Sequence, residues 1–407
     1  MNAEIFELGD IQLQSGRCLR QARLAYQTYG ELNAAKDNVI VYPTSFAATH
    51  DDTAWLIGEG RALDPNKYFI VVPDAFGNGV SSSPSNTPAP HNGNRFPRIT
   101  VHDNVIQQQR LLSERFGIGK IRLAIGWSLG GSQAFEWAAA YPDQVQRLFT
   151  FQSAARTSRH FQVFFDSVRA AIELHPAFDQ GFYDQPPHRG LRVAARIYAG
   201  WGFSQAFYRE RLDQRVLGYA SLEDFLIDFW EGWFLKRDAN DLLAQLWMGQ
   251  HADISANPRY RGNIDQALAA IKADTVIMPS SSDLYFPVLD AEQEARGIAR
   301  AELRVLESDW GHVAGEGLND ADTQGIERAI SELLARCARG AGALVTAPAG
   351  RENAGIASTT MLPSCRRTRK PPDGSPYPCR NGSNPCHLAG HRAPAVRRAR
   401  LCADLDG

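Results

Sequence analysis

Gly126-Trp127-Ser128-Leu129-Gly130-Gly131 reads G-x-S-x-G-G and joins two segments of different character. Residues 121–125 before it form the short apolar run of a buried strand, whereas residues 132–140 have the pattern of a helix. Glycines let the backbone turn tightly between strand and helix without a Cβ clash, and the turn presents the Ser128 hydroxyl. The Leu129 amide then lies at the helix N-terminus, where it can stabilise an oxyanion. We predict that Ser128 is a nucleophile; the alternative is an ordinary glycine-rich turn with a surface serine.

The bulk properties are those of a globular protein. The 407 residues are enough for one large domain or two smaller ones, and the formal net charge of −2 gives no reason to expect nucleic acid or a membrane as partner. There is no apolar run of about 18 residues and no N-terminal signal-peptide pattern, so we expect a cytoplasmic protein without a transmembrane helix. Cys18 is the only cysteine among the first 336 residues, which excludes a disulfide framework there.

Strand and helix patterns alternate over residues 1–155. The strand candidates are residues 22–29, 38–42, 68–72, 121–125 and 148–151. Short apolar runs of this kind are typical of buried parallel strands, and the helical spacing of residues 101–116 leads into the strand before Ser128. This part of the chain therefore predicts the first part of an open α/β core with a mostly parallel sheet.

The pattern changes to aromatic-rich helices over residues 156–266, where no clear strand is found. We predict an inserted all-helical lid over the C-terminal edge of the sheet, although most of its aromatic residues are expected to serve as core. Residues 267–340 return to the α/β pattern, with strands at 274–279 and 302–306 and a closing helix at 326–339. They form the predicted second part of the core.

Residues 341–407 differ in kind. They are rich in Pro, Gly, Ser and Arg, and they hold ten Lys or Arg against four Asp or Glu. A segment with so little apolar periodicity is predicted to be disordered. Its cysteines and histidines lack the pair spacing of a zinc site. A basic tail could bind nucleic acid, and an out-of-frame extension would explain the composition equally well.

A serine becomes nucleophilic when a histidine, oriented by a carboxylate, takes its proton. Ser128, Asp283 and His312 occur in the chain order found in α/β-hydrolases. Asp283 and His312 each follow a predicted strand, so all three can meet at one edge of the sheet. Asp309 and Asp290 are the competing carboxylates, but Asp309 is only three residues from His312 and Asp290 is expected within a helix.

The second oxyanion donor is expected from the loop after an early strand. The backbone N–H of Ser45 or Phe46, in the stretch Pro43-Thr44-Ser45-Phe46-Ala47, is the best candidate. The following His50-Asp51-Asp52 could hold a metal, but a loop that caps the helix beginning near Thr53 explains it better, and we predict no metal site.

Four segments resemble motifs of the homoserine O-acetyltransferase family. They are Y-Q-T-Y-G-E-L-N at 26–33, F-P-R-I-T-V-H-D at 96–103, D-A-N at 238–240 and S-D-L-Y-F-P at 282–287. Their order and spacing hold from about residue 5 to residue 338. The resemblance implies an α/β-hydrolase fold and two-step acyl transfer, in which the serine takes an acetyl group from acetyl-CoA and passes it to a hydroxyl. Water as acceptor would make the enzyme an esterase. The resemblance implies no permanently bound cofactor, and it implies a homodimer.

The resemblance also marks Arg196, in Gly190-Leu191-Arg192-Val193-Ala194-Ala195-Arg196, as the position of a carboxylate-binding arginine. An arginine lying along a helix surface is the alternative.

The sequence departs from the family pattern at the positions that, by the resemblance, would hold the amino-acid substrate. Val313 stands where the family has an aspartate suited to an ammonium group, and His102 replaces an arginine. Pro43–Ala47 replaces the family's oxyanion segment, and Gly202-Phe203 replaces Thr-Tyr. We therefore expect a serine-dependent acyltransferase or esterase whose substrate lacks a free ammonium. Authentic homoserine acetylation and a catalytically silent binding protein are the alternatives.

Overall fold

The parallel strands predicted from short apolar runs form the centre of one sheet. The structure, a computed structural model, describes residues 3–336, so the tail predicted to be disordered lies outside the described residues. The strands are β1 Glu4–Gln12, β2 Cys18–Tyr29, β3 Val39–Val41, β4 Phe69–Pro73, β5 Leu123–Trp127, β6 Arg147–Phe151, β7 Asp274–Met278 and β8 Ala301–Leu303. Their order is β1-β2-β4-β3-β5-β6-β7-β8. Only the β1–β2 and β2–β4 pairs are antiparallel.

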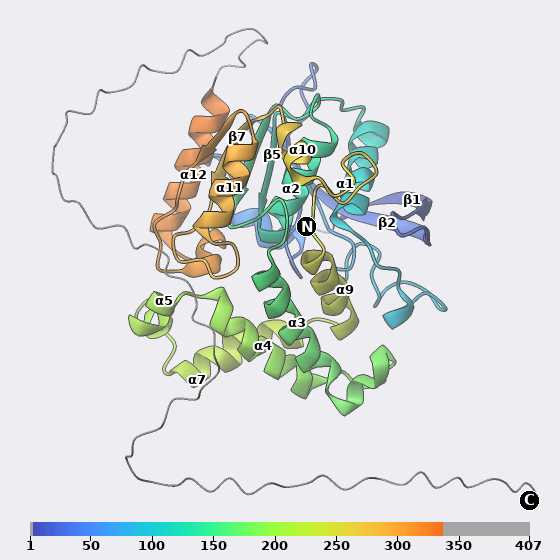
Figure 1. Cartoon of the computed structure of the whole chain (residues 1–407), viewed down its shortest axis with the longest axis vertical. Helices are drawn as coiled ribbons and strands as arrows, with labels where there is room; N and C mark the ends of the chain where they lie inside the picture. The colour runs from blue at the N-terminus through green and yellow to red at the C-terminus, as the bar shows by residue number, and fades with distance from the viewer. Residues whose placement is uncertain (1–2, 337–407) are drawn as a thin grey trace, which may run out of the picture. The chain divides into compact units, whose positions relative to one another are not determined.

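Helices cover both faces of this sheet, as Figure 1 shows. Those outside the predicted lid are η1 His50–Leu56, η2 Gly93–Arg95, α1 Val101–Arg110 with its continuation η3 Leu111–Arg115, α2 Ser128–Ala140, α11 Val288–Gly297, η6 Gly311–Gly315 and α12 Asp320–Ala335. Successive strand residues pack into different cores: Ile40 belongs to one buried cluster, and Val39 and Val41 belong to the other. The sheet is therefore buried on both sides, which explains why its strands read as unbroken apolar runs.

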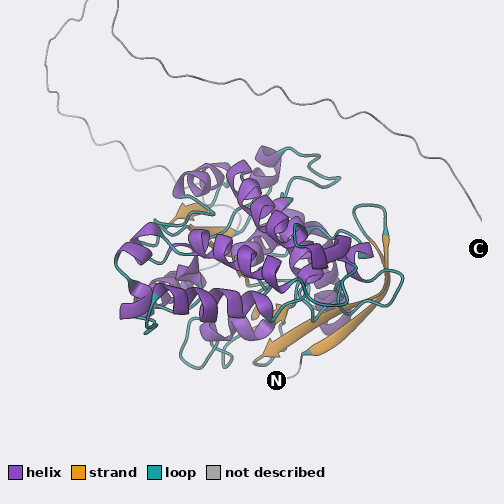
Figure 2. Cartoon of the chain, turned by 90° about the horizontal axis from the view of Figure 1, so that it is seen from below, coloured by secondary structure: helices purple, strands orange, loops and turns teal. Residues whose placement is uncertain are grey.

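The chain between β6 and β7 is helical, as predicted. It holds α3 Arg159–Glu173, η4 Pro176–Gly181, α4 His188–Gly202, α5 Gln205–Arg209, α6 Leu212–Arg215, α7 Leu222–Phe225, η5 Leu226–Glu231, α8 Gly232–Leu235, α9 Ala239–Gln250 and α10 Ile264–Ala269. Helices α3, α4, α5, α7 and α9 gather at one end of the sheet in Figure 1, and Figure 2 views this helical layer from below. Within residues 3–336, no helix is both long and apolar enough to cross a bilayer.

The strand bounds differ from the prediction at several ends: β2 begins at Cys18 rather than residue 22, and β8 spans Ala301–Leu303 rather than 302–306. The strand before Ser128 runs to Trp127 rather than ending at residue 125, because its pairing with β6 continues to Trp127 opposite Phe151. Strand β1 has no counterpart in the prediction. It is an edge strand in which only Leu8 and Ile11 are buried, so it lacks the apolar run that marks the central strands.

Candidate active site

Ser128 lies at the junction of β5 and α2, where the sequence predicts the nucleophile. Its φ of +53° is in the left-handed region, which is strained for a residue other than glycine. The turn is so tight that a Cβ on Gly126 would overlap the backbone of Gly130. This geometry presents Ser128 at the C-terminal edge of the parallel strands, the edge at which α/β sheets bind ligands.

Ser128, His312 and Asp283 form one hydrogen-bonded chain. His312 Nε2 lies 2.9 Å from Ser128 Oγ, and His312 Nδ1 lies 3.0 Å from Asp283 Oδ2. All three residues are buried, with at most 6 % of their surface exposed. The structure thus brings together the three side chains that the sequence selects, from the start of α2, the loop after β7 and η6.

Backbone donors hold the Asp283 carboxylate in place. Its Oδ1 accepts the N–H of Tyr285 at 2.7 Å and that of Phe286 at 3.3 Å, which leaves Oδ2 for the imidazole. The competing carboxylates are not the partner of His312 Nδ1, and Asp290 lies in α11 as predicted.

Aromatic rings fix the imidazole of His312. The Trp127 ring stacks on it at 4.9 Å between centroids and an interplanar angle of 29°, and the Tyr285 ring lies at 4.2 Å. The Trp127 indole N–H also donates to the His312 carbonyl at 3.2 Å. His312 therefore has little freedom to turn away from Ser128.

The predicted oxyanion donors come from the start of α2 and from the loop after β3. Leu129 belongs to the first turn of α2, where N–H groups have no acceptor within the helix. Within residues 3–336, the N–H groups of Ser45 and Phe46 donate to no acceptor, and both residues line the pocket together with Ser128. The Gln133 side chain donates to the Thr44 carbonyl at 2.9 Å, which ties this loop to α2.

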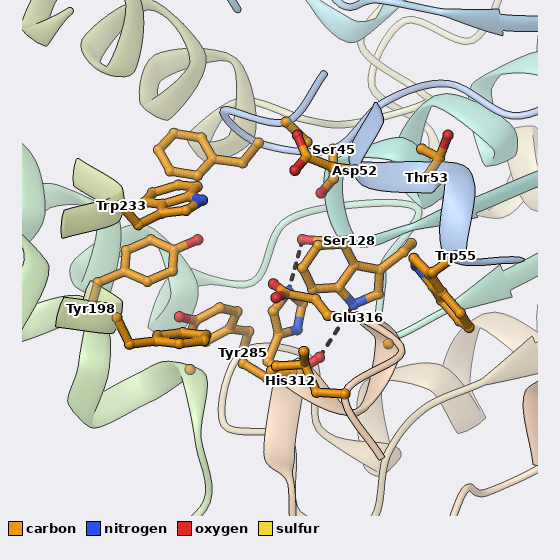
Figure 3. Close-up of a pocket in the computed structure, with 18 of the residues that line it drawn as sticks. Ser45, Asp52, Thr53, Trp55, Ser128, Tyr198, Trp233, Tyr285, His312 and Glu316 are labelled. Carbon is orange, nitrogen blue, oxygen red and sulfur yellow. Dashed lines mark hydrogen bonds between the residues drawn. The ribbon is translucent and has the colours of Figure 1, made fainter. Parts of the chain in front are cut away.

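A cavity of about 270 Å³ opens over Ser128. Tyr198 of α4, Trp230 of η5 and Trp233 of α8 supply its helical wall, as Figure 3 shows in part. Its aromatic lining residues are Tyr42, Phe46, Trp55, Trp127, Tyr198, Phe229, Trp230, Trp233 and Tyr285. The hydrogen-bonded chain therefore lies at the base of an aromatic chamber between the sheet and the inserted helices.

The alpha/beta hydrolase fold family matches residues 38–316, a segment that contains all three members of the hydrogen-bonded chain. The chain belongs to the alpha/beta hydrolase fold family. It is 37% identical to an ethyl acetate hydrolase from Pseudomonas veronii over 334 residues. The matched segment covers 81% of this chain and 95% of the relative.

A solved structure of the acetyl esterase MekB is similar to this chain, with 36% identity, a TM-score of 0.80 and coverage of 83% of this chain and 97% of that one. A homoserine O-acetyltransferase from Chlorobaculum parvum is 33% identical over 324 residues, 76% of this chain and 89% of the relative. Both esterases thus exceed this acetyltransferase in identity and coverage.

Glu316 is a pocket residue that the sequence does not reveal. It follows the end of η6 and lines the cavity with Ser128 and Val313. Burial raises the pKa of its carboxyl to about 7, and the charge of Asp52 acts in the same direction. The sequence clue to Glu316 is its spacing from Val313, because a residue three positions later lies one turn further along a short helix.

Arg196 is not among the residues that line this pocket. Its Nε donates to Glu231 at 2.6 Å, and its terminal nitrogens bind Glu223. Two carboxylates of the protein thus occupy the guanidinium, so the carboxylate-binding role implied by the resemblance has no support in this geometry.

The His50-Asp51-Asp52 segment forms part of η1 and caps it. Asp52 accepts the N–H of Thr49 at 2.7 Å, and His50 Nδ1 lies 2.7 Å from Asp74 Oδ2. In the part of the chain that the structure describes, no group of three or more His, Cys, Asp or Glu side chains could hold a metal ion.

Proposed function

We propose that this hydrolase is a serine-dependent esterase that cleaves small acyl esters. The observation that carries the proposal is the chain from Asp283 through His312 to Ser128 at the base of an aromatic cavity. An ethyl acetate hydrolase and an acetyl esterase among its relatives support a short acyl group.

In the first half-reaction, His312 Nε2 takes the Ser128 proton while Oγ attacks the ester carbonyl carbon. Asp283 holds the imidazole and stabilises its positive charge. The N–H of Leu129, with that of Ser45 or Phe46, is proposed to bind the oxyanion. His312 then gives its proton to the departing alkoxide, which leaves as the alcohol. The acyl group stays bound to Ser128 Oγ.

Water completes the cycle in the second half-reaction. His312 takes a proton from the water that attacks the acyl carbonyl and returns a proton to Ser128 Oγ, so that a carboxylic acid leaves.

A substrate hydroxyl in place of water would make the same site an acyltransferase. Homoserine O-acetylation from acetyl-CoA is the second candidate, supported by 33% identity to one such enzyme. The engagement of Arg196 by two glutamates favours the esterase, because it leaves this guanidinium unavailable to a substrate carboxylate.

Ser128→Ala tests the proposal. We expect hydrolysis of p-nitrophenyl acetate to fall by about 10³-fold or more, because removal of a triad member leaves only binding and the oxyanion hole. Unchanged turnover would refute a serine mechanism. Release of CoA from acetyl-CoA that depends on homoserine would favour the transferase. Failure of a fluorophosphonate to label Ser128 would favour a silent binding protein.

A further inference from the structure

The pocket over Ser128 carries an acidic wall. Asp52, from η1, and Glu316, after η6, both line it, whereas no Lys or Arg does so within the described residues. Figure 3 shows Asp52 beside Ser45 and Thr53, and Glu316 near Ser128 and His312. Aromatic faces and carboxylates both attract cations, so the lining complements a positively charged group better than a neutral one.

Glu316 has free hydrogen-bonding capacity. Asp52 accepts hydrogen bonds from the N–H and the hydroxyl of Thr49, at 2.7 and 3.2 Å. Glu316, in contrast, accepts no hydrogen bond and forms no ion pair within residues 3–336. Glu316 is partly exposed and faces the cavity without a partner, so a ligand that supplies a positive charge would stabilise its ionised form.

Arg237, which follows α8, does not fill this role. Its Nε donates to the Ala47 carbonyl at 2.9 Å, and Nη1 donates to the Trp233 carbonyl at 2.6 Å. Its guanidinium carbon lies 3.8 Å from the centre of the Trp233 ring. Arg237 is not among the lining residues, so it offsets the acidic charge only from outside the cavity.

We propose that Glu316 is a specificity-determining residue that binds a cationic group, and that this hydrolase takes acyl esters of amino alcohols. The ester carbonyl would lie at Ser128 and the ammonium among the rings beside Glu316. This inference rests on the proposed esterase function. It replaces the expectation, drawn from Val313, that the substrate lacks an ammonium, because Glu316 supplies the missing anion one turn further on.

The charges around Glu316 agree with this assignment. Burial and Asp52 raise the pKa of Glu316, whereas Arg237 lowers it, and the net value is about 7. Tyr198 from α4 and His312 from η6 also face the cavity. A bound cation stabilises the ionised form, so the preference for a cationic ester should increase from pH 6 to pH 8.

The test compares acetylcholine with 3,3-dimethylbutyl acetate, an uncharged ester of the same shape. We expect wild-type kcat/KM at pH 8 to favour acetylcholine by about tenfold, and Glu316→Gln to bring the ratio close to one. The ratio within one variant is the readout, because a general loss of activity cancels from it. Glu307→Gln removes the same charge from an exposed site outside the pocket and should keep the wild-type ratio.

A second measurement needs no variant. Choline should inhibit p-nitrophenyl acetate hydrolysis more strongly than uncharged 3,3-dimethylbutanol does. Hydrolysis of the neutral ester with no preference for acetylcholine, or a preference that survives Glu316→Gln, would overturn the inference and leave the esterase proposal standing. Absence of all ester hydrolysis would instead overturn the esterase proposal and the inference together.

Discussion

At the residue scale, Ser128 is held in a conformation that few serines adopt. A positive φ at such a residue costs about 1–3 kcal/mol, and the surrounding structure must maintain it. The Ser153 hydroxyl donates to the Ser128 carbonyl at 2.6 Å, while His312 engages the Ser128 hydroxyl at the other end. The direction of Oγ is therefore set before any substrate arrives, which is what an attack on a bound carbonyl requires.

Asp283→Asn tests the role of the carboxylate. The substitution keeps the side-chain shape but removes the charge that stabilises the imidazolium, and an amide N–H facing Nδ1 favours the wrong tautomer of His312. We expect kcat for p-nitrophenyl acetate to fall about 10⁴-fold with little change in KM, measured by steady-state kinetics. Circular dichroism should show an intact fold. A loss of kcat below tenfold would contradict the assignment of Asp283.

At the element scale, the start of α2 positions the proposed oxyanion loop. A Cβ on Gly130 would meet the Pro43 carbonyl, so the helix and the loop after β3 touch backbone to backbone. The hydrogen bond from Gln133 to Thr44 fixes the same contact one turn further along the helix. The amides of Ser45 and Phe46 thus take their positions from α2, the helix that also carries Ser128.

Gly130→Ala should therefore disturb the site although alanine favours helices. The added methyl group pushes the loop away from Ser128, and a shift of about 1 Å at reacting groups can cost about 10²-fold in rate. We expect kcat for p-nitrophenyl acetate and the midpoint of thermal unfolding both to fall. Gly119→Ala is the control, because nothing lies within 4 Å of a Cβ there. Equal behaviour of the two variants would refute the contact argument.

At the scale of the whole molecule, the sequence predicts those features that depend on local residue patterns. The central strands are buried on both faces, so their apolar runs are visible, and Asp283 and His312 follow strands in a known order. Glu316 could not be predicted in the same way, because only the packing of α4, η5 and α8 over the sheet shows that its position lines the cavity. The ion pairs of Arg196 are equally invisible, since Glu223 and Glu231 come from later helices.

Carboxyl groups buried in different parts of the fold make its stability depend on pH. Burial raises the pKa of Glu294 to about 8 and those of Asp241 and Glu316 to about 7. In the unfolded chain they ionise near pH 4, so above that pH the folded state binds more protons than the unfolded state. Their contribution to stability is therefore fully present below about pH 4 and declines as the pH rises to about 8.

Glu294→Gln isolates one of these groups. Glu294 Oε1 accepts the Ala155 N–H at 2.7 Å, where β6 leads into the helical insertion, and Oε2 has no partner. Glutamine keeps the acceptor but cannot ionise. We expect the midpoint of thermal unfolding of this variant to match wild type near pH 5 and to exceed it increasingly toward pH 9. Glu292→Gln, on the same helix but partly exposed and paired with Arg296, should show no such divergence. Parallel pH profiles for Glu294→Gln and wild type would mean that Glu294 is ionised in the folded protein.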